Sequence, residues 1–257
     1  MQDINTSAYI VSPIETLEVV RIFIVQQKRG AYMRFGDGDI FLALGKSEAF
    51  QVSGESLALE MKEAFSLKGK RVLKALMLHS DLYGSEKEMY IGNHLISSQI
   101  ADKLLQYAYP FFVGYTIYSP VALHYVATYY TTIANEFLLL LREQAILFIG
   151  NENTPENIVR KLFGQVKHIK TPERNAYTRI DEIEYDTCVE LSKQKKFGVV
   201  IVSMGCSGRV LIKRLYKQDY PVFFFDFGSL LDGICGNETR TWLKKSKIDY
   251  EVLLNGL

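Results

Sequence analysis

Apolar and polar positions follow two different patterns along the chain, one near the N-terminus and another in the second half. From Ile14 to Ile24, apolar residues recur every three or four positions, which predicts a helix. Ser12 can cap this helix because Glu15 follows three residues later, the spacing of a capping box. Further on, short continuous apolar blocks alternate with stretches of helical period. The elements expected after the first helix are a strand at 31–35, a helix at 56–65, a strand at 72–79, a long apolar helix from 119 to about 141, a strand at 145–149, a helix at 155–163, a strand at 166–169, a helix at 179–195, a strand at 198–203, a helix at 207–217 and a strand at 222–226.

Short apolar strands that alternate with helices are typical of a parallel sheet covered on both faces. We therefore predict an α/β fold with a Rossmann-like, mostly parallel sheet, helices on both faces and an N-terminal helix. No repeat or flexible linker interrupts the sequence, so residues 1–257 are expected to form one domain with a tyrosine-rich helical insert at about 104–142. Ligands of such sheets bind beyond the carboxyl ends of the strands, which selects the loops 36–39, 205–208 and 226–229.

Composition and charge exclude several classes of protein. The chain has 257 residues, with 30 Lys and Arg against 29 Asp and Glu, so no global charge recruits nucleic acid. Three scattered cysteines form neither a disulfide framework nor a zinc motif. The first residues lack the pattern of a secretory signal. We therefore expect a cytoplasmic protein, with the inner face of the membrane as a secondary location.

One long stretch, between Lys103 and Glu136, contains no charged residue. A membrane-spanning helix needs about 20 predominantly apolar residues. Here two prolines, a glycine, a histidine and seven tyrosines interrupt the run. The pattern favours buried or cleft-lining structure without a transmembrane segment, and peripheral contact with a membrane is the minority interpretation.

The loop at 36–39 carries two carboxylates, Asp37 and Asp39, separated by one glycine. Mg²⁺ and Mn²⁺ prefer oxygen ligands and often use one or two carboxylates together with substrate phosphates. Because the loop follows a predicted strand, the pair is a candidate site for one of these cations. A solvent-exposed turn is the alternative, since Asp-Gly is a common turn dipeptide.

Two further loops follow predicted strands. The loop 205–208, Gly-Cys-Ser-Gly, opens a helix whose N–H groups can hold a phosphate, or it is only the tight turn between strand and helix. It has neither the full G-x-G-x-x-G spacing nor a Walker lysine. Asp226 ends an apolar strand and is a candidate general base or hydroxyl ligand, or else a helix cap. Further candidates for ligand contact are Gln51, Asn175, Tyr177 and Asp181.

These motifs together resemble a known family. Residues 34–39, Arg-Phe-Gly-Asp-Gly-Asp, followed by Gly45 and by Phe50 and Gln51, are similar to the N-terminal motif of the GT-D glycosyltransferases, which usually reads Arg-Phe-Gly-Asp-Gly-Glu. Residues 148–150, 172–176, 199–215 and 226–229 resemble later blocks of that family. There are two departures: Asp39 replaces the usual Glu, and the sequence after Ser229 lacks the histidine of the best-known branch.

The resemblance implies a metal-dependent glycosyltransferase of the hexosyltransferase type. It would move a sugar from a nucleotide-sugar donor, with UDP-sugars favoured, to a glycan or glycoconjugate acceptor in polysaccharide or glycoprotein assembly. Asp37 and Asp39 would bind Mn²⁺ or Mg²⁺, and Asp39 and Asp226 would be catalytic. Two alternatives stay open: a non-catalytic nucleotide- or sugar-binding module, and a nucleotide-cofactor enzyme such as a methyltransferase. The residues expected to bind the donor are Arg34, Gly36, Gln51, Asn175, Gly205, Ser207, Gly208, Gly228 and Ser229.

Overall fold

The structure of the protein is a computed structural model that describes residues 9–77, 98–237, 243 and 246–257. Six described strands form one sheet in the order β2-β1-β6-β5-β3-β4, and each neighbouring pair is parallel. The predicted α/β fold with a parallel sheet is therefore confirmed. The strands are β1 (Gly30–Phe35), β2 (Val72–Leu76), β3 (Ala145–Asn151), β4 (Lys167–Thr171), β5 (Gly198–Ser203) and β6 (Val222–Asp226).

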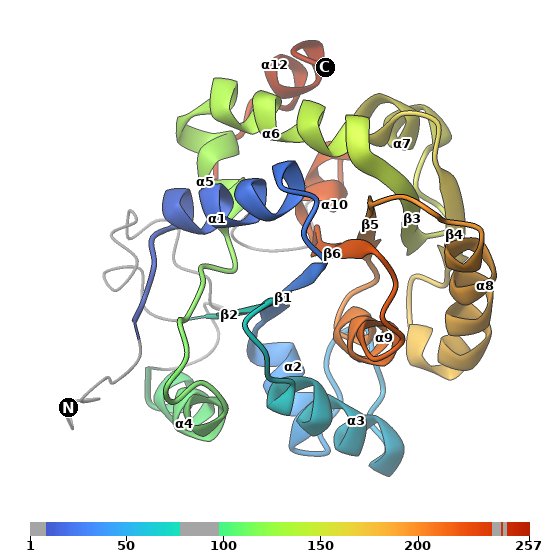
Figure 1. Ribbon diagram of the computed structural model, residues 1–257. Helices are drawn as coiled ribbons and strands as arrows, with labels where there is room; N and C mark the ends of the chain where they lie inside the picture. The colour runs from blue at the N-terminus through green and yellow to red at the C-terminus, as the bar shows by residue number, and fades with distance from the viewer. Residues whose placement is uncertain (1–8, 78–97, 238–242, 244–245) are drawn as a thin grey trace.

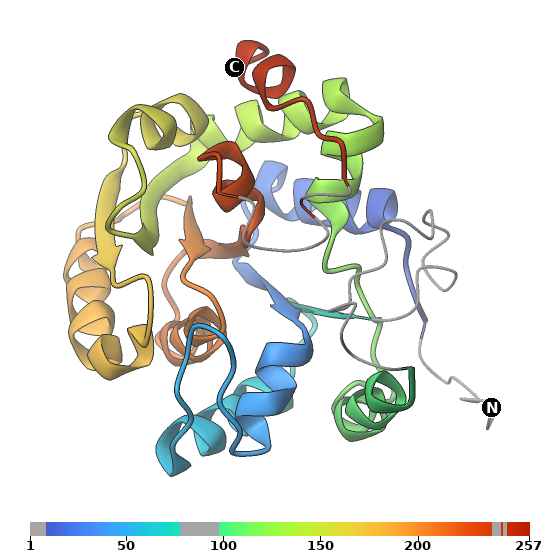
Figure 2. The same cartoon turned by 180° about the vertical axis from the view of Figure 1, so that it is seen from behind.

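Helices cover both faces of the sheet, as Figure 1 shows. One face carries α1 (Pro13–Val25), α5 (Ala122–Tyr129), α6 (Thr131–Gln144), α7 (Glu156–Phe163), α10 (Leu230–Ile234) and α12 (Tyr250–Asn255). The other carries α2 (Asp37–Ala43), α3 (Glu55–Ser66), α4 (Ser98–Ala108), α8 (Ile180–Ser192) and α9 (Ser207–Tyr216). The C-terminal helix α12 packs on α6, which is also visible from behind in Figure 2. Two short 3-10 helices, η3 (Tyr109–Phe111) and η4 (Ala176–Arg179), are also described.

Successive side chains of the central strands point to opposite faces of the sheet, so the strands contribute to two separate hydrophobic cores. On β6, Val222 and Phe224 pack with the helices of one face, whereas Phe223 and Phe225 pack with those of the other. All five residues of β6 are buried. A strand that is apolar on both sides belongs in the middle of a covered sheet, and β6 lies there, between β1 and β5.

The N-terminal helix follows the predicted pattern. The Ser12 hydroxyl accepts a hydrogen bond from the Glu15 N–H at 3.2 Å, and the Glu15 carboxylate accepts one from the Ser12 N–H at 2.9 Å. Leu17, Val20 and Ile24 are buried against the sheet. The capping box and the apolar spacing therefore place α1 as expected.

Three predicted elements differ from the structure. The loop 36–39 is not a turn, because Gly36 is the N-cap of α2 and the helix begins at Asp37. The long apolar helix from 119 to about 141 is two helices, since Tyr130 has φ −142° and ψ 59° and separates α5 from α6. The strand expected at 72–79 ends at Leu76, and its last two predicted residues lie outside the described part of the chain.

The tyrosine-rich segment at about 104–142 contributes to both helix layers. Its first part, α4 and η3, packs with one core, and α5 and α6 pack with the other. Between them the chain passes the edge of the sheet, where the Tyr118 N–H donates to the Lys74 carbonyl at 3.0 Å and the Leu76 N–H donates to the Tyr118 carbonyl at 3.2 Å. Across the described ranges, no helix has both the length and the apolar character needed to cross a bilayer.

A cluster of ion pairs fastens α3 to α9. Glu60 accepts hydrogen bonds from Lys213 at 2.7 Å and from the Nε of Arg214 at 2.7 Å, and Tyr177 donates to the same carboxylate at 2.8 Å. Burial would raise the pKa of Glu60, but these donors lower it to about 2. The cluster fixes the position of α3 relative to α9, and the N-terminus of α9 faces the candidate site.

Candidate functional site

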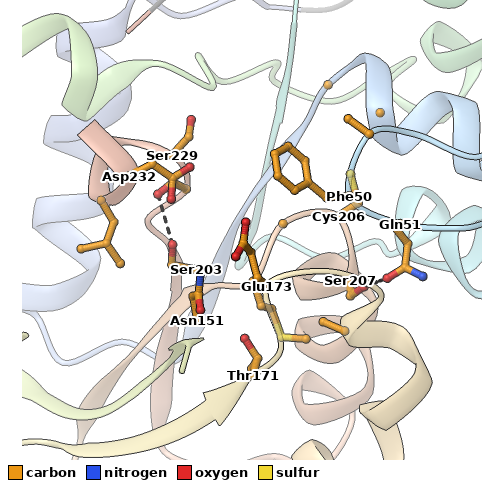
Figure 3. A pocket seen from close by; sticks show the side chains of 18 of the residues that line it. Phe50, Gln51, Asn151, Thr171, Glu173, Ser203, Cys206, Ser207, Ser229 and Asp232 are labelled. Atoms are coloured by element: carbon orange, nitrogen blue, oxygen red, sulfur yellow. Dashed lines mark hydrogen bonds between the residues drawn. The ribbon is translucent and has the colours of Figure 1, made fainter. Parts of the chain in front are cut away.

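A cavity of about 630 Å³ lies at the carboxyl ends of the strands. Its wall includes the loops that follow β1, β3, β4, β5 and β6, together with the loop between α2 and α3. This is where a parallel sheet binds its ligands, and the volume is within the range of small-molecule pockets. Figure 3 shows labelled side chains from five of these segments around the same space.

The two aspartates of the loop after β1 do not face the same point. They occupy the first and third positions of α2, and residues two positions apart on a helix point to different sides. The Asp37 side chain is partly exposed at the cavity, and its Oδ1 accepts from the Gly38 N–H at 2.9 Å. Asp39 is 2% exposed, and its Oδ2 accepts from the Gly36 N–H at 2.8 Å. Asp39 therefore caps the helix from inside, and Asp37 is the carboxylate of the pair that is open to the cavity.

Arg209, from α9, lies between two buried carboxylates. Its Nε is 3.4 Å from Asp39 Oδ1 and 3.3 Å from Asp226 Oδ2. The same Nε donates to the carbonyl of Arg34, and Nη1 donates to the carbonyl of Gly205. The loops after β1, β5 and β6 are thus joined through one guanidinium group.

Burial and charge set the protonation of this cluster. Burial raises the pKa of Asp39 to about 6, although the Arg209 charge acts in the opposite direction. Burial alone would lower the pKa of Arg209, but Asp226 and Asp39 raise it above its ordinary value. Burial lowers the pKa of Arg34, and Asp226 partly offsets this effect. The cluster therefore contains two guanidinium groups and two carboxylates, and burial makes the Asp39 carboxylate easier to neutralise than an exposed aspartate.

Arg34 is held under the loop after β6, and a glycine makes this possible. Its N–H donates to Asp226 Oδ2 at 3.1 Å, and its Nη1 donates to the Phe227 carbonyl at 2.9 Å. Gly228 has φ +69°, and a Cβ there would lie 1.5 Å from Arg34 Nη1. Gly228 and the neighbouring Ser229 both line the cavity, and the Ser203 hydroxyl donates to the Gly228 carbonyl at 3.2 Å (Figure 3).

The loop after β5 offers fewer free polar groups to a ligand than its sequence indicates. Gly205 has φ +60° and lines the cavity, as do Cys206 and Ser207. The Ser207 hydroxyl is buried and donates to Gln51 Oε1 at 2.9 Å, which also accepts from the Tyr177 N–H at 3.1 Å. In the structure, Ser207 and Gln51 therefore bind each other, although both lie at the cavity wall.

Other predicted residues lie outside the cavity wall. Gly208 packs inward, where a Cβ would be 3.1 Å from Val202 Cγ1. Asn175 has a left-handed backbone, with φ 55°, and its Oδ1 accepts from the Val52 N–H at 2.8 Å. Its N–H donates to the Phe50 carbonyl at 2.8 Å. Asn175 thus ties the loop between α2 and α3 to the loop after β4. Asp181 forms an ion pair with Arg214, and Tyr177 bonds to Glu60.

Sequence reasoning missed several polar residues of the cavity. Arg209 looks like one of many basic positions on a helix, and no motif marks it. Asn151 and Thr171 could have been found, because each lies two residues past the end of a predicted strand, where the strand-end rule applies too. Thr171 is 1% exposed, and its hydroxyl has no hydrogen-bond partner among the described residues. The cavity-lining polar residues that were missed are Glu48, Asn151, Asn153, Thr154, Thr171, Glu173, Ser203, Arg209, Asp232 and Asn237.

The fit of the site to a divalent cation depends on Asp37. Within the part of the chain that the structure describes, no three His, Cys, Asp or Glu side chains surround a common point. Asp39 is engaged by Arg209 and by the Gly36 N–H, so this carboxylate has its charge partner within the protein. Asp37 presents a carboxylate at the cavity, and Mg²⁺ often uses a single protein carboxylate together with substrate phosphates. The site thus fits a cation held jointly by Asp37 and a phosphorylated ligand.

Comparisons with known proteins agree with one another on the fold. The family model described as glycosyltransferase GT-D fold matches residues 32–231. A solved structure described as a new glycosyltransferase (DUF1792) from Streptococcus sanguinis is similar over 90% of this chain and 86% of that one, with a TM-score of 0.61 and 16% identity. A selenomethionine-substituted structure of domain of unknown function 1792 is similar over 90% and 83%, with a TM-score of 0.65 and 19% identity. No curated protein sequence matches the chain.

Proposed function

The chain belongs to the family of glycosyltransferases with the GT-D fold, and from this premise we propose that it transfers a sugar from a nucleoside-diphosphate sugar to a hydroxyl group of a glycan or glycoconjugate. The observation that carries the proposal is the cavity at the carboxyl ends of β1, β3, β4, β5 and β6. Its wall combines charged groups at one part with neutral polar groups at another, as a diphosphate joined to uncharged sugars requires. Family membership also favours glycosyl transfer over the methyltransferase alternative.

The charged part of the wall supports binding of the donor diphosphate. Arg209 contributes a guanidinium group that Asp39 and Asp226 hold in place. The loop after β5 contributes the N-terminus of α9, where helix geometry favours an anion. Asp37 would hold Mn²⁺ or Mg²⁺ against the same diphosphate. Such a cation, when bound, neutralises the charge that develops on the leaving nucleoside diphosphate.

The neutral part of the wall supports binding of the uncharged portions of the substrates. Asn151 and Thr171 end neighbouring strands, and Ser203 ends the strand on the other side of β3. Amide and hydroxyl groups of this kind recognise sugar hydroxyls by reciprocal hydrogen bonds. The exposed Glu173 carboxylate lies at the same wall and can accept a proton or a hydroxyl hydrogen bond.

Asp226 was predicted as a general base, but its carboxylate is already bonded to two arginine residues. Its Oδ2 accepts from the Arg34 N–H and pairs with Arg209. Asp226 is also 3% exposed and does not line the cavity, so it is poorly placed to take a proton from a bound acceptor. We expect its main contribution to be the placement of Arg209, and Asp226→Asn to lower both donor affinity and turnover.

The proposal is tested by ligand binding followed by turnover. Thermal unfolding with UDP, GDP, CDP or ADP, each with and without Mn²⁺, should show a metal-dependent rise in Tm for one nucleotide, with UDP expected. A ligand at about 100 times its Kd stabilises by about 2.7 kcal/mol, a shift of a few degrees. Hydrolysis of the corresponding nucleotide sugar should then be lost in Asp37→Asn. No response to any nucleoside diphosphate would refute the proposed donor. Binding without turnover of any nucleotide sugar would favour the non-catalytic module.

A further inference from the structure

Phe50 offers an aromatic face to the cavity, and it does so from a loop that the protein holds rigidly. Among the described residues that line the cavity, the aromatic side chains are Phe35 and Phe50. Phe35 is fully buried and stacks on Phe65 with the ring centroids 4.2 Å apart. Phe50 is only partly buried, and Figure 3 shows its ring projecting into the space between the loop after β5 and the loop after β6. A ligand ring in this cavity thus finds its aromatic partner at Phe50.

Hydrogen bonds fix the backbone on both sides of this ring. The Phe50 carbonyl accepts from the Asn175 N–H at 2.8 Å, and the Ala49 carbonyl accepts from Arg174 Nη1 at 3.0 Å. The Val52 N–H donates to Asn175 Oδ1 at 2.8 Å. Gln51, next to Phe50, is buried and bonded to α9 through Ser207. A ring held in this way is ordered before the ligand arrives, which lowers the entropy cost of binding.

Charge near the ring further defines its ligand. The guanidinium of Arg174 lies over the Phe50 ring, 5.3 Å from its centroid. A cation over a ring is attracted to its π face, and flat π systems prefer stacked arrangements with an aromatic ring. Cys206, in the loop where the α9 N-terminus begins, lines the same cavity as Phe50. A ligand whose phosphates occupy that helix terminus would therefore place its adjoining nucleoside near Phe50.

We propose that Phe50 is the stacking platform for the nucleobase of the donor, with Arg174 supporting the opposite face of the ring. This inference rests on the proposed function, because it assigns one part of the donor to one residue of the same cavity. Stacking tolerates any base, since every base has a π face. Phe50 would thus supply affinity for the nucleoside, and the choice of base would come from polar neighbours such as Glu173.

The test distinguishes binding of the nucleoside from binding of the phosphates. Calorimetric titrations with Mn²⁺ present would compare UDP, GDP, CDP, ADP and inorganic pyrophosphate on wild type, Phe50→Ala and Phe50→Trp. Phe50→Ala should raise the Kd of the nucleotide that binds wild type by about tenfold and leave that of pyrophosphate unchanged. Phe50→Trp should retain nucleotide affinity. Tyr185→Ala is the matched control, because this aromatic residue of α8 is 69% exposed and does not line the cavity.

Each other outcome overturns the assignment in a recognisable way. Equal loss of nucleotide and pyrophosphate affinity would mean that Phe50 only supports the loop. Unchanged nucleotide affinity, with weaker binding of the nucleotide sugar or the acceptor, would place a sugar on the ring instead. If wild type binds pyrophosphate but no nucleoside diphosphate, the proposed donor fails and the stacking platform fails with it. Unchanged nucleotide affinity in Phe50→Ala refutes the platform alone.

Discussion

Replacing Arg209 with methionine removes the cation that lies between two buried carboxylates. The side chains of Asp39 and Asp226 are each 3% exposed, and both depend on the Arg209 Nε at 3.4 and 3.3 Å. Loss of one partner from a buried ion pair costs about 3–5 kcal/mol, because a charge then remains in a poorly solvated position. Methionine keeps much of the aliphatic stem, so the lost packing is small. We expect Arg209→Met to lower the free energy of unfolding by about 3–5 kcal/mol at pH 8.

The loss should depend on pH, because a carboxylate without a partner can take up a proton. Burial already raises the pKa of Asp39 to about 6 with Arg209 in place, and removal of the arginine raises it further. At pH 5 the variant therefore carries less uncompensated charge, and its deficit relative to wild type should shrink. Urea unfolding followed by circular dichroism at pH 8 and pH 5 measures both values.

A matched control substitution, at an arginine in an exposed ion pair, tests whether the loss of stability comes from burial of the ion pair. Arg179 pairs with Glu182 on the surface, with the two side chains 43% and 56% exposed. Exposed pairs contribute about 0–1 kcal/mol, so Arg179→Met should be nearly neutral at both pH values. The reasoning is refuted if the two variants lose similar stability at pH 8, or if the deficit of Arg209→Met is the same at pH 5.

Four further substitutions have expected outcomes that denaturant unfolding can check. Burial raises the pKa of Asp39 above its unfolded value, so protonation stabilises the native state, and this contribution is lost as the pH rises through about 6. Wild type should therefore gain stability relative to Asp39→Asn, by on the order of 3 kcal/mol at most, as the pH falls from 7 to 4. Gly228→Ala should lower the free energy of unfolding by at least about 2 kcal/mol, because the new Cβ displaces Arg34. Gly45 also has a positive φ, +76°, but a Cβ there would meet no atom within 4 Å, so Gly45→Ala should lower the free energy of unfolding only by the backbone strain of about 1–2 kcal/mol. Hydrogen bonds from a neighbouring arginine, lysine and tyrosine outweigh burial and lower the pKa of Glu60 to about 2. The ionised Glu60 therefore stabilises the native state fully above about pH 4.5, and this stabilisation is lost as the pH falls further. The stability deficit of Glu60→Gln at pH 7 should narrow between pH 4.5 and 2, and a constant deficit would contradict the assignment.

The sequence predicted the sheet well because its central strands are apolar on both sides. The run Phe223–Phe224–Phe225 has no polar face, and only a central strand under two helix layers buries such a run. The first helix was equally clear, since Ser12 and Glu15 cap it through local contacts. Both predictions depend on residues close together in the chain, which sequence patterns record directly.

The candidate site was predicted only in part, because its geometry depends on distant segments. The start of α2 at Asp37 is stabilised when the Asp39 carboxylate accepts from the Gly36 N–H, and Arg209 then pairs with that carboxylate. The order of the strands, with β6 beside β1, brings these groups together. Nothing local in the helix around Arg209 distinguishes it from the basic positions that follow. The sequence therefore indicated which loops meet, but not which side chains contact each other.

The different environments of the two aspartates separate stability from donor binding. Asp39 is buried and bonded to the Gly36 N–H and to Arg209, so its replacement disturbs the helix start and the ion-pair cluster together. Asp37 is partly exposed at the cavity and bonds only to the adjacent Gly38 N–H among the hydrogen bonds of the described residues. Asp37→Asn should therefore leave the free energy of unfolding within about 0.5 kcal/mol of wild type. The same variant should lose the Mn²⁺-dependent part of nucleotide binding, whereas Asp39→Asn should change both quantities. Equal losses of stability in the two variants would contradict the separate roles, because then both carboxylates would serve the fold.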